Sequence, residues 1–138
     1  MSPARHDPSG VPTPTEPNPA LCEAISREMV LLQKQFAGKG PTRCKTFIEG
    51  DLIFVLFGGG YTAAEQTLYE AGRFVDVRLA RTAFQDTMKL QFSRKIEELS
   101  GREVIAFMSA SHQDPDLALE AFVLKPLSAA VTASAATQ

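Results

Sequence analysis

Residues 101–124 constrain the fold of this chain more than any other segment. Residues 103–111 and 117–124 are apolar runs, and the Phe-Val-Leu end of the second run favours a strand over a helix. An Asp-Pro-Asp sequence, typical of turns, separates the two runs. The segment therefore predicts an antiparallel hairpin. Its loop region gathers the most reactive side chains, namely Ser109, Ser111, His112, Asp114 and Asp116.

A first helix is predicted to begin at Pro19 or Ala20 and to end before Gly38. Asn18 is a suitable N-cap, and proline suits the first helical position. Gly38, and Gly40 followed by proline, end the helix. Apolar side chains recur at steps of three and four, which places them on one face. They are Leu21, Ile25, Met29, Leu32 and Phe36.

A second hairpin is predicted over residues 42–57. Along residues 42–49, mainly charged side chains alternate with less polar ones. This leaves one face of the strand polar, as is typical of a strand at a sheet edge. Residues 52–57 are apolar throughout, which indicates a strand covered on both faces. Gly50-Asp51 joins the two strands.

Two further helices are predicted between the hairpins. Thr62 and Glu65 have the spacing of a capping box and begin a short helix that ends near Glu70. Residues 73–99 form a helix of about 40 Å, which Gly101 terminates. This helix is longer than so small a domain needs, and it carries a second apolar patch. We therefore expect a homodimer through the helix over residues 73–99.

The order of elements is helix, strand, strand, helix, helix, strand, strand, which predicts an α+β fold. We expect a two-layer sandwich, with a four-stranded, mostly antiparallel sheet and the helices on one face. The strands over 52–57 and 103–111 should be central, because both are apolar on both sides. A second subunit would then cover the other face of the sheet.

The domain boundaries follow from composition. Residues 1–19 hold six of the nine prolines and few apolar residues, which predicts a disordered tail. Residues 128–138 are small and uncharged, which predicts a second low-complexity tail. A single domain over residues 20–127 remains.

Charge and hydropathy narrow the classes of function. The net charge of −2 gives no reason to expect nucleic-acid binding. The longest apolar run, 52–57, is far shorter than the ~20 residues of a membrane-spanning helix, so we expect no membrane insertion. Cys22 and Cys44 form no CxxC pair, which indicates a reducing, cytoplasmic compartment and no structural zinc. We expect no cofactor.

The glycine run Gly58, Gly59 and Gly60, followed by the capping residue Thr62, is one candidate ligand site. Backbone N–H groups at such a turn can bind an anion. The spacing matches neither a phosphate-binding loop nor a dinucleotide fingerprint. The simpler interpretation, which we favour, is a strand-to-helix turn that needs positive φ.

His112 with Asp114 and Asp116 is the other candidate. A histidine beside carboxylates can act as a general base or bind a metal. A metal would need a further ligand from elsewhere, and His6 lies in the predicted tail. We favour an ordinary loop in which the histidine bonds to the backbone. Ser109 and Ser111 lack a nucleophile-elbow motif, so a hydrolase is disfavoured.

Two groups of basic residues have a structural explanation that we prefer. Lys34, Lys39, Arg43 and Lys45 could contact phosphates, but a solvated sheet edge is the favoured interpretation. Arg73, Arg78 and Arg81 mix with acidic residues on the long helix and are expected to be surface charges or the rim of an interface.

Several segments carry a family resemblance. They are ISREMVLLQKQFAGKGPTRCKTFIEGDLIFVLFGG, TAAEQTLYEAG, RTAFQDTMKLQF, EELSGREVIAFMSASHQDPD and EAFVL. Together, over residues 22–125, they resemble the MpsC-like family, which is named for a sodium-translocating, membrane-potential-generating system. The resemblance implies association with a membrane ion or inorganic-carbon uptake system. It suggests a small cytoplasmic accessory or regulatory protein, which could be peripheral at the inner membrane face. No catalytic residues are assigned to this chain from the resemblance.

Three functions are therefore weighed. The first is a non-catalytic accessory protein that acts through protein contacts, including those with a membrane-transport protein. The second is a sensor of a small anion or nucleotide at the Gly58–Gly60 turn. The third, ranked last, is an enzyme centred on His112 and Asp114. Both ligand-based hypotheses weaken if these residues do not share one pocket.

Overall fold

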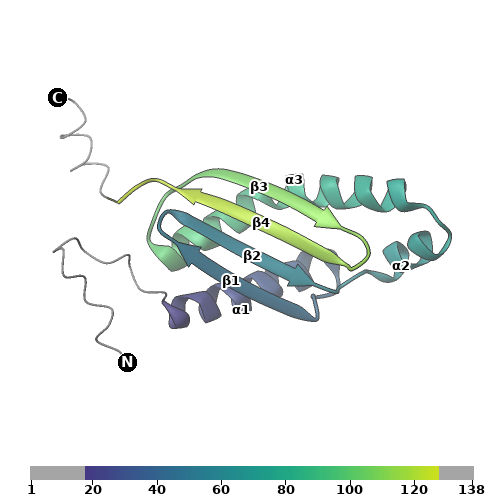
Figure 1. Ribbon diagram of the computed structural model, residues 1–138, viewed down its shortest axis with the longest axis horizontal. Coiled ribbons are helices and arrows are strands. Elements are labelled where there is room, and N and C mark those ends of the chain that lie inside the picture. The colour runs from purple at the N-terminus through teal and green to yellow at the C-terminus, as the bar shows by residue number, and fades with distance from the viewer. Residues whose placement is uncertain (1–17, 128–138) are drawn as a thin grey trace, which may run out of the picture.

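The computed structural model describes residues 18–127, and the two predicted tails lie outside them except for Asn18 and Pro19. The described chain has three helices and one four-stranded sheet in the predicted order, which confirms the α+β class (Figure 1). The elements are α1 (Pro19–Ala37), β1 (Arg43–Glu49), β2 (Leu52–Gly58), α2 (Ala63–Glu70), α3 (Phe74–Ser100), β3 (Val104–His112) and β4 (Leu117–Leu124).

Local sequence signals set the helix ends. Asn18 Oδ1 accepts a hydrogen bond from the Leu21 backbone N–H at 3.0 Å and caps α1. Gly38 ends the same helix in the left-handed conformation, with a φ of 84°. The capping box at α2 is present in full: Thr62 Oγ1 accepts from the Glu65 N–H, and Glu65 Oε1 accepts from the Thr62 N–H.

The strand order is β1-β2-β4-β3, and every neighbouring pair is antiparallel. The prediction that β2 and β3 are both central is therefore wrong for β3, which is an edge strand, whereas β4 is central. The apolar character of β3 does not come from burial on two faces. Ile105 and Met108 are 54% and 58% exposed, so hydrophobic side chains on this strand face outward.

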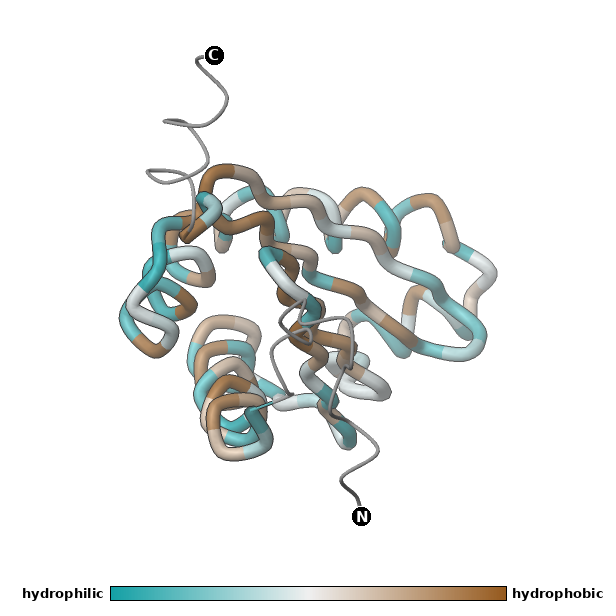
Figure 2. Tube along the Cα trace, turned by 60° about the vertical axis from the view of Figure 1, so that its left-hand side comes forward, coloured by the Kyte–Doolittle hydropathy of each residue, from teal (hydrophilic) through white to brown (hydrophobic). Residues whose placement is uncertain are grey.

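Helices α1 and α3 lie on the same face of the sheet, behind it in the view of Figure 1. Hydrophobic residues gather along the strands, whereas the β3–β4 loop is hydrophilic (Figure 2). Burial alternates along each central strand, so one side faces the helices and the other does not. The core between the layers includes Ile25, Met29, Ile53, Val55, Met88, Phe92, Ile96 and Phe122, each at most 2% exposed.

Different contacts hold the two ends of the sheet. Helix α2 buries no side chain; it packs beside α3, where the Tyr69 and Phe74 rings are 5.1 Å apart between centroids. At the opposite end, Arg102 Nη2 donates to Asp51 Oδ1 at 2.6 Å and to the Lys125 carbonyl at 2.8 Å. Arg102 thus ties the β1–β2 turn to the chain beyond β4.

Candidate functional site

The connection from β2 to α2 is built on glycines. Gly59 and Gly60 have φ of 77° and 98°, a region that side chains rarely adopt. At Gly59 an added Cβ would lie 2.2 Å from Thr42 Oγ1, and that hydroxyl donates to the Gly58 carbonyl at 2.9 Å. The glycine run is therefore required by conformation and by the close approach of Thr42.

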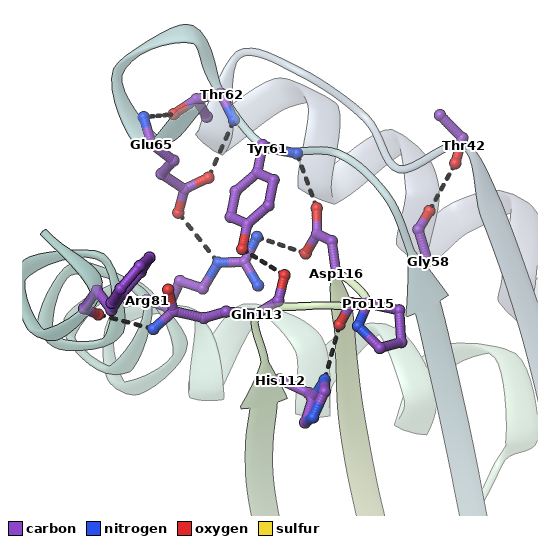
Figure 3. Close-up of polar contacts among 11 residues, drawn as sticks. Thr42, Gly58, Tyr61, Thr62, Glu65, Arg81, His112, Gln113, Pro115 and Asp116 are labelled. Atoms are coloured by element: carbon purple, nitrogen blue, oxygen red, sulfur yellow. Dashed lines mark hydrogen bonds and ion pairs between the residues drawn. The ribbon is translucent and has the colours of Figure 1, made fainter. Parts of the chain in front are cut away.

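Asp116 accepts hydrogen bonds from two backbone N–H groups at the glycine turn. Its carbonyl accepts from the Gly59 N–H at 2.9 Å, and its Oδ2 accepts from the Tyr61 N–H at 3.1 Å. An internal carboxylate thus lies at the turn that was considered as an anion site (Figure 3). An external anion would have to displace this carboxylate or bind next to it.

Arg81 joins Asp116 to α2. Its Nη2 donates to Asp116 Oδ1 at 2.6 Å, and its Nε donates to Glu65 Oε2 at 3.2 Å (Figure 3). The guanidinium lies 4.3 Å from the centre of the Tyr61 ring, and the Tyr61 hydroxyl donates to the Gln113 carbonyl. The network connects three segments that are far apart in the sequence: the β2–α2 connection, α3 and the β3–β4 loop.

The charges of this network are sheltered from water. The side chains of Arg81, Glu65 and Asp116 are 11%, 17% and 14% exposed. The prediction that Arg81 is an ordinary surface or rim charge is wrong, whereas Arg73 does form an exposed pair with Asp76. The Arg81 Nη1 atom is buried and has no hydrogen-bond partner among residues 18–127.

A cavity of about 350 Å³ adjoins the network, between the sheet and parts of all three helices. Its walls are mainly apolar, and Gly59, Gly60 and Thr62 border it. Its polar lining includes Arg81, Gln85 and Glu120. Such a cavity lies at the small end of the range for ligand pockets, about 300–1,000 Å³.

Glu120 lies on the helix-facing side of β4, is only 2% exposed and lines the cavity. Its carboxylate accepts a hydrogen bond from the Ser109 hydroxyl on the neighbouring strand. Burial raises the pKa of Glu120 to about 7, and hydrogen bonds from Ser109 and Gln85 partly oppose that rise. The group therefore changes charge near neutral pH.

The predicted site residues fall into two separate places. Gly59, Gly60 and Thr62 line the cavity, and Gly58 lies beside them in β2. His112 and Asp114 line a shallow depression with Tyr69 and Phe74 instead. The glycine run and the histidine do not share a pocket, which weakens both the sensor hypothesis and the enzyme hypothesis.

His112 is the last residue of β3 and has a backbone partner in the loop that follows. Its Nδ1 lies 2.8 Å from the Pro115 carbonyl oxygen, and the side chain is exposed. Within residues 18–127, no three His, Cys, Asp or Glu side chains are grouped so that they could hold a metal ion.

Sequence reasoning missed Arg81, Asp116 and Glu120 as parts of one site. Arg81 and Asp116 are 35 positions apart, and only the fold brings them together. For Glu120 a signal was present: alternation along residues 117–124 puts a glutamate in phase with Phe122 and Leu124. A charged residue in phase with the apolar side of a strand indicates a buried ionisable group.

The fold and site define a small α+β domain with one helix-covered sheet face and a partly polar internal cavity. The chain belongs to the family described as the Na⁺-translocating membrane potential-generating system (MpsC), whose model matches residues 19–126. No curated protein and no solved structure matches the chain. Among the described residues, no helix has the length and apolarity needed to cross a membrane.

Proposed function

We propose that this chain is a non-catalytic accessory or regulatory protein, associated with a sodium-translocating, membrane-potential-generating or inorganic-carbon transport system. The observation that carries the proposal is the family match over residues 19–126. With no spanning helix in the described part of the chain, its contribution would be made through contacts with a membrane-transport protein.

Exposed apolar side chains on α3 support a role in protein contacts. Leu79 and Leu90 are 61% and 55% exposed on a helix whose opposite side packs into the core. They are eleven positions apart, so both lie on the same side of α3, about 16 Å from each other, where one partner could contact both. Cys22 and Cys44 are free thiols, which suits a cytoplasmic position at the inner membrane face.

Deleting the gene in the source organism and measuring the sodium-dependent membrane potential tests the proposal. We expect the potential to fall and to recover when the wild-type chain is supplied. The Leu79→Glu variant should fold and yet fail to restore the potential, and Glu23→Gln, exposed on α1, is the matched control. An unchanged potential after deletion would refute the proposal.

The cavity favours a second candidate, a sensor of a small anion or nucleotide. The unpartnered Arg81 Nη1 is a buried donor beside the glycine run, and an anion oxygen could accept from it. Thermal unfolding with millimolar phosphate, bicarbonate or ATP tests this function. Binding should raise Tm in the wild-type chain and not in Arg81→Gln, whereas no rise with any probe removes the candidate.

A further inference from the structure

The sheet face that points away from the helices is apolar through its middle. Cross-strand pairing aligns Phe47, Phe54, Ala121 and Met108 in one row across all four strands. Phe47 and Met108, at the two ends of this row, are 47% and 58% exposed. No described element covers the row, because α1 and α3 both lie on the opposite face (Figure 1).

The rows on either side of this middle row are also apolar except on β1. One row runs from Lys45 through Leu56 and Leu119 to Ala110, and the other from Glu49 through Leu52 and Val123 to Ala106. In these two rows the β1 edge therefore carries one cation, Lys45, and one anion, Glu49, at equal distances from Phe47. Arg43 adds a second cation one row further out, beside Gly58.

The open face is a continuous surface rather than a set of scattered residues. Four strands about 4.8 Å apart and seven residues at about 3.4 Å each give roughly 450 Å². This area is comparable to the largest apolar patch of a typical monomer, about 300–600 Å², and a patch of that size is often functional. Two such faces, packed about 10 Å apart, would form the apolar centre of a standard interface.

We propose that a second copy of this chain covers the open face, with the two-fold axis running along the Phe47–Met108 row. Rotation about this axis reverses each strand and lays it over its own counterpart. Lys45 of one copy then lies opposite Glu49 of the other, and the symmetry repeats this pair. Leu56 lies opposite Leu52 in the same way, so apolar side chains meet apolar side chains.

Charge distinguishes this axis from the main alternative. An axis parallel to the strands would lay β1 over β3 of the other copy. Lys45 would then face Ala110 and Glu49 would face Ala106, so that each charge would meet an apolar side chain without a partner. Only the axis across the strands pairs Lys45 of one copy with Glu49 of the other.

This inference goes beyond the proposed function and does not depend on it.

A charge-exchange series on the full chain, measured by sedimentation velocity over a range of concentrations, tests the pairing. The wild-type chain should dimerise. Lys45→Glu and Glu49→Lys should each weaken the dimer about tenfold, because each places like charges opposite one another twice. The double variant Lys45→Glu/Glu49→Lys should return to within about threefold of the wild type. A double variant as weak as the single ones overturns the proposed axis.

A second set of variants tests which surface of the chain forms the dimer. Met108→Lys lies on the proposed axis and should give a monomer with an unchanged circular dichroism spectrum. Leu31→Lys on α1 and Leu79→Lys on α3 are equally exposed controls and should leave the dimer intact. A wild-type chain that stays monomeric, or a dimer broken by Leu79→Lys and not by Met108→Lys, overturns the proposal.

Discussion

The two faces of the sheet carry similar hydrophobic side chains, but only the face towards the helices is buried. On the helix side, Ile53, Val55 and Phe122 are buried, and one carboxylate, Glu120, is buried with them. On the open side, Phe47 and Met108 are just as hydrophobic and remain about half exposed. The helix side is completed within the chain, whereas the open side has the composition of a core and no described cover. Hydrophobicity alone therefore does not tell which face of a strand is buried.

The strongest contrast between the faces should come from removing the same ring on each side. Phe122→Ala should lower the free energy of unfolding by about 3–5 kcal/mol, because it leaves a cavity in a fully buried site. Phe47→Ala should cost less than about 1 kcal/mol in the monomer, because half of that ring already meets water. Urea unfolding at low protein concentration measures both. Similar losses would show that the open face is covered within the chain.

The second largest loss of stability from a single substitution is expected at the Arg81 network, on the side of the sheet that the helices cover. Arg81→Ala should lower the free energy of unfolding by roughly 2–3 kcal/mol, because Glu65 and Asp116 lose their counter-charge in a sheltered site. The loss is smaller than for a fully buried pair, because all three groups retain some solvent contact. Arg73→Ala, which breaks the exposed pair with Asp76, should change it by less than about 0.5 kcal/mol. Equal effects would mean that the network is not sheltered.

Glu120 should give the helix side a pH dependence that the open side lacks. Its folded pKa of about 7 lies above the ordinary value of 4.5, so the folded state holds the proton more tightly. The contribution of this group to stability should be fully present below about pH 4.5. It should be lost as the pH rises to 7, which lowers the free energy of unfolding by roughly 3 kcal/mol.

The Glu120→Gln variant should remove this slope and be the more stable chain at pH 8. Urea unfolding at pH 5 and pH 8 is the measurement, with the exposed Glu23→Gln as the matched control. If Glu120→Gln keeps the wild-type slope, the carboxyl does not titrate in this window.

The smallest effect is expected at His112, which lies on the open side near the β3–β4 loop. His112→Ala should change the free energy of unfolding by less than about 0.5 kcal/mol, because the exposed ring makes one contact with the Pro115 carbonyl. In the complementation assay this variant should restore the membrane potential fully. A folded His112→Ala chain that fails to do so would favour an enzyme over an accessory protein.

Local sequence signals predicted most of the fold. The Asn18 cap, the Thr62–Glu65 capping box and the glycines after α1 and α3 act within a few residues, so the sequence contains all that sets them. The alternation of side chains along residues 42–49 is also a local pattern, and it predicted that β1 is an edge strand. The family was also predicted, because its motifs follow one another along the chain.

The rest depends on contacts between distant residues. β3 is as apolar as a central strand. It is nevertheless an edge strand, because β4 pairs between β2 and β3 after the β3–β4 loop. The Arg81–Asp116 pair and the burial of Glu120 depend on the register of β4 and on its packing against α3. The candidate cavity was therefore only partly predicted, through Gly59, Gly60 and Thr62.

The attachment of α2 has a consequence for motion. This helix buries no side chain, and the Arg81 network provides much of its link to the rest of the domain. Its detachment would break few apolar contacts, so it can open by local unfolding while the layers around Phe92 stay intact. Amide hydrogens of residues 67–70 should accordingly exchange with solvent far faster than those in the middle of α1 or α3.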